Sequence, residues 1–109
     1  MPRNLTRSNQ HWHKAVTRLP LGVASNFRYW GEERTIYVKQ GRGARIEDID
    51  GNRYVDYLLG LGPMILGHRP ATVTAAVHRA IDEAGTCFAL PTPPEADLAE
   101  KIVSIIGQR

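Results

Sequence analysis

The segment with the strongest local signals is residues 50–68, DGNRYVDYLLGLGPMILGH. It begins with Asp50-Gly51, a dipeptide typical of a tight hairpin turn in which the chain needs a positive φ. After a short strand-like run comes an apolar segment that is interrupted by Gly60, Gly62-Pro63 and Gly67. Neither a helix nor a regular strand runs through this spacing, so the sequence predicts a loop. An apolar loop rich in glycine is typical of a pocket wall or an interface.

Segments rich in β-branched and aromatic residues surround this turn and predict strands at residues 35–40, 44–49 and 53–58. The middle segment alternates polar and apolar residues only at its start, which suggests a bulge. Residues 41–43, Gly-Arg-Gly, supply the turn between the first two strands. The pattern therefore predicts a small antiparallel meander.

After the glycine-rich loop, apolar residues recur with helical spacing over residues 71–84 and again over residues 93–106. Gly85 provides the stop signal for the first of these helices. Thr92 and Glu95 stand at the spacing of a capping box, with a proline at the first helical position. These signals predict two amphipathic helices.

The N-terminal region predicts a shorter helix. Ser8 is a suitable cap for a helix that carries Trp12 and Leu19 on one face and is closed by Pro20. The segment alone therefore has an α+β pattern of an N-terminal helix, a meander and two amphipathic helices. A three-strand meander covers only part of the apolar surface of these helices. We expect an incomplete domain, with a compact α+β fold as the alternative.

The composition indicates an ordinary globular protein. The 109 residues are 42% hydrophobic and 23% charged, with a formal net charge of +3. The arginines are scattered and form no basic stripe, so we expect no nucleic-acid partner. Cys87 is the single cysteine, so an internal disulfide is excluded, and no other residue stands at metal-ligand spacing from it. No signal peptide or membrane-spanning run appears, so we expect a cytoplasmic protein without a membrane partner.

Two groups of residues are candidates for ligand binding. Arg28 presents a planar guanidinium that suits a carboxylate, and the Ser25 hydroxyl three residues earlier adds a donor. The alternative is a surface arginine stacked on its aromatic neighbours. His68 ends the glycine-rich loop, where it either hydrogen-bonds loop carbonyls or contacts a ligand. The incomplete G-x-G pattern that starts at Gly60 lacks its third glycine and a following helix, so a dinucleotide site is not expected.

The chain resembles the N-terminal part of the class-III aminotransferases, and in particular the glutamate-1-semialdehyde aminomutase branch, over residues 19–106. The motifs that carry the resemblance are residues 19–28, 43–57, 61–63 and 66–68, followed by Phe88, Pro91-Thr92, Glu95 and residues 98–100.

The resemblance implies a pyridoxal-phosphate enzyme with the α/β aspartate-aminotransferase fold, fold type I, that works as a homodimer. It implies an amino acid or amine substrate, with a choice between transaminase and aminomutase chemistry. Residues 1–20 would form a helical arm, and residues 21–109 would be the first part of the enzyme. In this family the Schiff-base lysine and the other residues that hold pyridoxal phosphate come later in the sequence. We therefore expect this chain alone to be inactive.

The resemblance also implies residue roles. Arg28 matches the arginine that binds the substrate carboxylate, and Ser25 lies beside it. The other implied positions are the pocket wall Gly60, Leu61 and Gly62, and the loop Phe88, Ala89 and Leu90 near the partner subunit's site. The aminomutase branch has a tryptophan at the position of Leu61 and a threonine at that of Gly60, so this pocket should be roomier. The rival hypothesis is a free-standing, non-enzymatic dimerisation or regulatory module.

Overall fold

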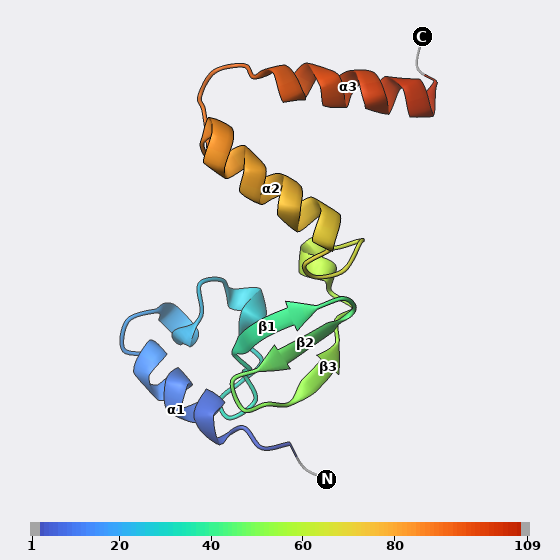
Figure 1. Ribbon diagram of the computed structural model, residues 1–109. Coiled ribbons are helices and arrows are strands. Elements are labelled where there is room, and N and C mark those ends of the chain that lie inside the picture. The colour runs from blue at the N-terminus through green and yellow to red at the C-terminus, as the bar shows by residue number, and fades with distance from the viewer. Residues whose placement is uncertain (1–2, 108–109) are drawn as a thin grey trace. The chain divides into compact units, whose positions relative to one another are not determined.

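The computed structural model describes residues 3–107. Its elements in chain order are α1 (Thr6–Ala15), η1 (Pro20–Gly22), η2 (Asn26–Arg28), β1 (Val38–Arg42), β2 (Arg45–Asp48), β3 (Arg53–Val55), η3 (Leu59–Leu61), α2 (Ala71–Ala84) and α3 (Pro93–Ile106) (Figure 1). The chain divides into two compact units, residues 1–74 and residues 75–109. Within the described residues, no helix combines the length and the apolar composition that crossing a bilayer requires.

The predicted meander is confirmed. The three strands form one antiparallel sheet in the order β1-β2-β3, with Ile46 of β2 paired with Gly41 on one side and Tyr54 on the other. The register irregularity lies in β1, between Val38 and Gln40, and not in the second strand as predicted. The arrangement of helices with a small antiparallel sheet confirms the predicted α+β pattern of this segment.

The strand boundaries differ from the prediction for local reasons. β1 starts later because the Thr35 hydroxyl donates to the Gly31 carbonyl at 3.0 Å and closes a turn there. β1 also includes Gly41 and Arg42, which were predicted to form the turn. β3 ends at Val55, before residues 56–58 that were predicted to extend it.

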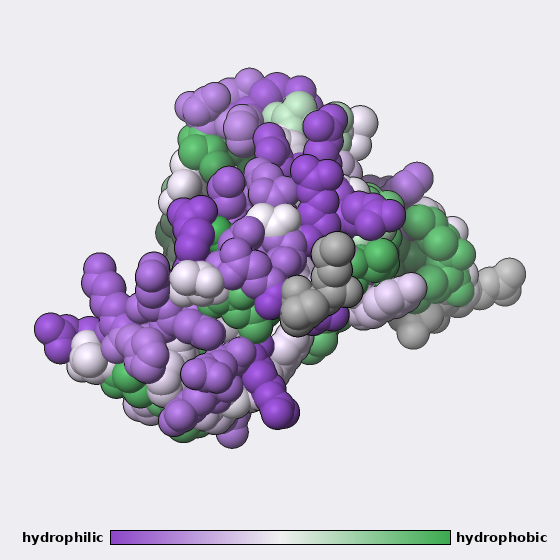
Figure 2. Space-filling model, turned by 90° about the horizontal axis from the view of Figure 1, so that it is seen from below, coloured by the Kyte–Doolittle hydropathy of each residue, from purple (hydrophilic) through white to green (hydrophobic). Residues whose placement is uncertain are grey.

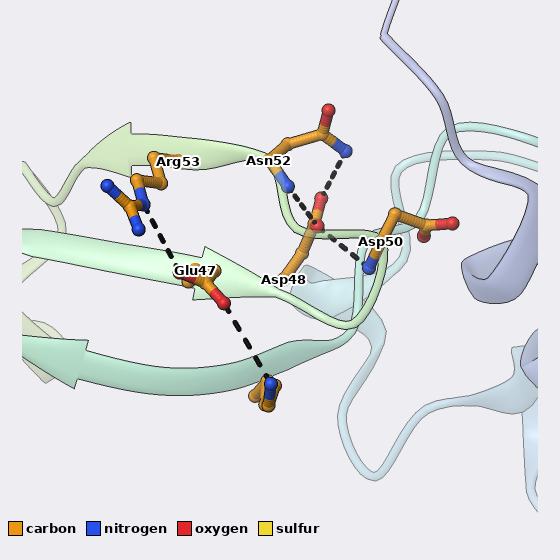
Figure 3. Close-up of polar contacts among 6 residues, drawn as sticks. Glu47, Asp48, Asp50, Asn52 and Arg53 are labelled. Carbon is orange, nitrogen blue, oxygen red and sulfur yellow. Dashed lines mark hydrogen bonds and ion pairs between the residues drawn. The ribbon is translucent and has the colours of Figure 1, made fainter.

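A buried carboxylate organises the turn between β2 and β3. The Asp48 side chain is fully buried. Its Oδ1 accepts the backbone N–H of Asp50 at 2.9 Å and that of Asn52 at 2.8 Å. Its Oδ2 accepts the Asn52 side-chain amide at 2.8 Å and the Tyr54 hydroxyl at 2.7 Å. Figure 3 shows Asp48 facing the backbone nitrogens of this turn, with the Glu47–Arg53 ion pair on the adjoining strands. At the predicted Asp50-Gly51 position, Gly51 has the positive φ of 87° that the turn needs.

These contacts shift the pKa values of Asp48 and Tyr54. Burial acts to raise the pKa of Asp48, but the hydrogen bonds from Tyr54 and Asn52 and from the turn backbone outweigh it, so the pKa is lowered. Burial and the Asp48 carboxylate together raise the pKa of Tyr54 to about 12. The hydroxyl therefore remains a donor to Asp48 throughout the neutral range.

The same turn holds the N-terminal helix. The prediction that Ser8 caps this helix is wrong, because α1 begins at Thr6 and Ser8 lies inside its first turn. The Asp50 carboxylate accepts the backbone N–H groups of Arg7 at 2.6 Å and Ser8 at 2.9 Å, and the Ser8 hydroxyl at 2.5 Å. A carboxylate at this end satisfies free helical N–H groups and interacts favourably with the helix dipole. Asp50 thus caps a helix more than 40 residues earlier in the chain.

The other end of α1 packs on the segment that follows it. The Trp12 indole N–H donates to the Leu21 carbonyl at 3.2 Å. The His11 ring meets the Tyr37 ring edge-on, with centroids 4.4 Å apart. The Tyr37 hydroxyl in turn donates to the Gly22 carbonyl at 2.9 Å. These contacts connect α1, η1 and the segment before β1.

The two later helices have the predicted bounds. Gly85 takes a positive φ of 99° after α2, and Gly107 ends α3 in the left-handed conformation. The predicted capping box is present at the start of α3, where Glu95 Oε1 accepts the Thr92 backbone N–H at 3.1 Å and the Thr92 hydroxyl at 2.8 Å. Local sequence signals were sufficient for these elements.

The described residues bury no apolar side chain, and the buried side chains are the polar ones of Ser8, Thr35 and Asp48. Large apolar side chains are exposed on all parts of the chain, including Val73, Val77 and Ile81 of α2 and Leu98, Ile102 and Ile106 of α3. Figure 2 shows hydrophobic surface at several places among the hydrophilic residues. Burying one such side chain fully contributes about 2 kcal/mol, so these faces favour association with further protein.

We predict that Asp50→Ala lowers the free energy of unfolding by about 2 kcal/mol, because it removes the cap of α1 and leaves the buried Ser8 hydroxyl without its acceptor. Chemical denaturation measures the change. The matched control is Glu32→Ala, which removes an exposed carboxylate from a turn and should change stability by less than about 0.5 kcal/mol. Equal effects of the two substitutions would contradict the capping role.

The lowered pKa of Asp48 predicts a dependence of stability on acid. Its contribution is complete above the unfolded value of 3.8 and is lost as the pH falls through the lower folded value. Asp48→Asn should lower the free energy of unfolding at neutral pH by about 2 kcal/mol and should flatten the stability profile below that unfolded value. Denaturation curves recorded across the acid range test this. A variant whose acid dependence matches the unsubstituted protein would count against the assignment.

Candidate functional site

Ser25 and Arg28 lie together at the short helix η2. Ser25 precedes it, and its carbonyl accepts the Arg28 backbone N–H at 3.0 Å. The Arg28 guanidinium carbon lies 5.3 Å from the centre of the Phe27 ring, which is the stacking that the surface alternative predicted. Among residues 3–107 the guanidinium has no hydrogen bond or ion pair. Its donors therefore remain available for an anion.

The segment before η2 is fixed by close backbone packing. Gly22 is buried and has a φ of 70°, and a Cβ placed there would lie 2.8 Å from Trp12 Cδ1. The neighbouring Leu21 also has a positive φ, 58°. Trp12 and Tyr37 hold this strained segment through the hydrogen bonds to the Leu21 and Gly22 carbonyls. Contacts from α1 and from the residues just before β1 therefore fix the backbone that leads to Ser25.

The loop between Asp56 and His68, residues 57–67, includes the predicted glycine-rich segment and contains a left-handed turn. Consecutive positive φ values occur at Leu59, Gly60, Leu61 and Gly62, at 52°, 63°, 65° and 136°. This turn makes up η3, which the sequence did not predict as a helix. Left-handed backbone costs a non-glycine residue about 1–2 kcal/mol, and such strain is concentrated at functional sites. Most apolar side chains of the loop are exposed, with Tyr57 90% and Ile65 79% exposed, whereas Leu59 and Met64 are half-buried.

The two ends of this loop meet at its base. His68 Nε2 lies 2.7 Å from Asp56 Oδ2, and Asp56 Oδ1 accepts the backbone N–H groups of Leu58 and Leu59 at 2.9 and 3.1 Å. These hydrogen bonds lower the pKa of Asp56, and the one with His68 has the largest effect. His68 also pairs through its backbone with Gly43, in both directions. Of the two roles predicted for His68, the structure shows the structural one, with a carboxylate and not a loop carbonyl as the ring's partner.

The predicted site residues lie on three separate segments of the chain. No hydrogen bond between described residues links η2 with the loop that contains Gly60, Leu61 and Gly62. Phe88, Ala89 and Leu90 belong to the second unit, where all three are exposed. Phe88 there packs over Gly85, whose added Cβ would lie 3.4 Å from the Phe88 ring. Sequence reasoning missed Asp56, because it lay within a predicted strand.

The lysines test whether these residues fit a covalently held pyridoxal phosphate. Such a lysine needs a desolvated position that lowers its pKa. Lys14 and Lys101 are exposed on helices, and the Lys39 side chain is 59% exposed and lies 3.9 Å from Glu47. None of these three lysines has such a position in this structure.

Comparison with known proteins gives a consistent result. The family described as Aminotransferase class-III matches residues 28–109. Glutamate-1-semialdehyde 2,1-aminomutase of Pelotomaculum thermopropionicum is 41% identical over 108 residues, which is 97% of this chain and 25% of that protein.

Solved structures agree with the sequence match. A transaminase with PLP bound has a TM-score of 0.81 and 30% identity, covering 94% of this chain and 24% of that one. An omega-transaminase from Sphaerobacter thermophilus has a TM-score of 0.80 and 29% identity, with the same coverage of 94% and 24%. The predicted fold is confirmed, and the chain spans about a quarter of the length of the relatives it matches.

We predict that Gly22→Ala destabilises the segment before η2 by about 3 kcal/mol, because it adds backbone strain and a contact with the Trp12 ring. Gly43→Ala is the matched control, since Gly43 also has a positive φ, 55°, but its Cβ would meet nothing within 4 Å. The control should cost about 1 kcal/mol. Urea denaturation separates the two, and equal midpoints would show that contact with Trp12 does not fix this segment.

Proposed function

The chain belongs to the class-III aminotransferase family, and from this premise we propose that it is the substrate-facing N-terminal segment of a pyridoxal-phosphate-dependent transaminase or aminomutase. The substrate is an amine or amino acid that carries a carboxylate. The observation that carries this proposal is the Arg28 guanidinium, which is exposed and has no hydrogen-bond or ion-pair partner among residues 3–107.

Arg28 suits the binding of a substrate carboxylate on chemical grounds. A guanidinium donates two parallel hydrogen bonds to a carboxylate, which fixes both the position and the orientation of the anion. The Phe27 ring beneath it restricts the guanidinium and excludes water from one face. The Ser25 hydroxyl, from the same turn, is available as an additional donor to the anion.

The glycine-rich loop is proposed as a wall of the same pocket. Its left-handed turn presents backbone at Gly60 and Gly62, where a side chain would otherwise project. Leu61 is 67% exposed and offers an apolar surface to a ligand. Small and aliphatic residues at these positions leave room for a substrate with a bulky group beside its amine.

The cofactor is proposed to be bound by parts of the enzyme outside these residues. Pyridoxal phosphate supplies the electron sink for transamination when it is bound. The three lysines of this chain are exposed, so their role is not to hold it. In the working enzyme we assign to this chain substrate binding and the exclusion of water.

We also propose that the exposed apolar surfaces are covered in a full-length homodimer. The helix faces of α2 and α3 and the loop with Phe88, Ala89 and Leu90 are too apolar to remain in water. Phe88 and Leu90, which are 57% and 75% exposed, are candidates for a contact near the partner subunit's pocket.

The test is Arg28→Ala in the full-length enzyme. We expect KM for a carboxylate-bearing amino substrate to rise about 100-fold, because a charge-assisted bidentate contact is lost. KM for a simple amine without a carboxylate should be unchanged. The matched control is Arg18→Ala, which removes an exposed arginine whose guanidinium, within the described part of the chain, bonds only to Thr17. An equal loss on both substrates, or no loss on either, would refute carboxylate binding by Arg28.

A further inference from the structure

We propose that Asp56 and His68 act together as a positioning pair that holds the loop of residues 57–67 in its conformation, including the left-handed turn at residues 59–62. Through that conformation they set the pocket wall at Gly60, Leu61 and Gly62. The second statement rests on the proposed function, whereas the first concerns only the loop and its base.

The pair closes the loop from both ends. Asp56 is the last residue before the loop and His68 is the first after it, and their side chains lie 2.7 Å apart. The Asp56 side chain is only 8% exposed and that of His68 23%, so the contact is partly shielded from water, which strengthens it. Asp56 also starts the turn, because the same carboxylate accepts the backbone N–H groups of Leu58 and Leu59.

The sheet holds the His68 end of the loop in place. The Gly43 N–H donates to the His68 carbonyl at 2.9 Å, and the His68 N–H donates to the Gly43 carbonyl at 2.8 Å. The His68 ring lies against Gly41, where an added Cβ would lie 2.5 Å from the ring carbon Cγ. A methyl group at Gly41 would therefore push the ring away from Asp56. Asp56 is fixed on the other side by its N–H, which donates to the Ala44 carbonyl at 2.9 Å.

The loop needs this closure because its own residues do not stabilise the conformation. Leu59 and Leu61 adopt left-handed backbone that isolated residues avoid. Tyr57, Ile65 and Leu66 are 90%, 79% and 68% exposed, so their apolar side chains provide little anchoring within this chain. The loop's own hydrogen bonds are short-range backbone ones, such as Leu61 N–H to the Leu58 carbonyl at 2.9 Å. The contacts that oppose the strain are concentrated at the base.

The same geometry makes the pair relevant to the substrate. The carboxylate of Asp56 bonds the Leu58 and Leu59 amides directly before Gly60. A change at the base is therefore passed along a few residues of backbone to the wall. Neither side chain has to touch the substrate, so the two are positioning residues and not catalytic ones.

The experiment uses the full-length protein and two substitutions that disturb the pair by different routes. His68→Ala removes the ring, and Gly41→Ala displaces it while leaving Asp56 and His68 chemically intact. Hydrogen exchange, followed by mass spectrometry of the peptide that covers residues 57–67, should become about tenfold faster in both variants. The peptide of α3, residues 93–106, should be unchanged. His68→Gln keeps a donor for Asp56, so residues 57–67 should exchange more slowly in this variant than in His68→Ala.

The control for charge and position is Glu47→Gln. It removes a carboxylate from the same sheet, one that pairs with Arg53 at 3.2 Å and, among the described residues, makes no hydrogen bond or ion pair with the loop. Loop exchange in this variant should match that of the unsubstituted protein. If His68→Ala and Gly41→Ala leave loop exchange within about twofold of the unsubstituted protein, the positioning pair is refuted, whatever Arg28→Ala shows.

The link to the pocket has its own readout. In both variants KM for the carboxylate-bearing substrate should rise about tenfold with a smaller change in kcat, because the wall binds and does not react. Faster loop exchange with unchanged KM would overturn the assignment of Gly60, Leu61 and Gly62 to the pocket wall. It would leave the loop closure itself established. Carboxylate binding by Arg28 is judged separately by its own substitution.

Discussion

The carboxylate of Asp48 is the contact on which the order of the first unit depends. It is fully buried, and it accepts the backbone of the β2–β3 turn together with the side chains of Asn52 and Tyr54. Because the turn is held in this shape, the Asp50 carboxylate meets the start of α1. A buried charge is tolerated only when its hydrogen bonds are satisfied, and here four donors satisfy it. The positions of α1 and of the sheet are thus coupled through one polar turn.

This polar interior contrasts with the apolar exterior. The described residues bury polar side chains, while aliphatic and aromatic ones face outward on the helices and on the glycine-rich loop. Hydrogen bonds can fix directions between elements, but each contributes only about 1 kcal/mol to net stability. The burial of apolar surface is the dominant favourable term in folding. The segment therefore has well-defined local geometry and depends on further protein for much of its stability.

Both parts of the proposed site show the same contrast between polar contacts that fix the backbone and groups that remain exposed. Arg28 offers unused donors on a short helix, and Trp12 and Tyr37 hold the preceding backbone at Leu21 and Gly22. The loop after β3 offers strained backbone and apolar side chains that Asp56 and His68 hold from its base. In each case the groups proposed to meet the ligand have few contacts of their own, and polar contacts fix the backbone next to them. Such an arrangement would keep the proposed binding surface rigid while leaving it accessible.

The sequence by itself determined the elements whose signals lie within a few residues of one another. The bounds of α2 and α3, the Thr92–Glu95 capping box, the Asp50-Gly51 turn and the antiparallel meander followed from local patterns, and the family followed from the order of motifs. Tertiary structure decided which distant groups meet: Asp50 with the start of α1, the His68 ring with Asp56, and Gly22 with Trp12. Ser8 was therefore assigned as a cap when it is a buried donor, and Asp56 was hidden within a predicted strand. Local backbone preferences act over about four residues, whereas a hydrogen bond across 42 residues exists only once the chain has folded.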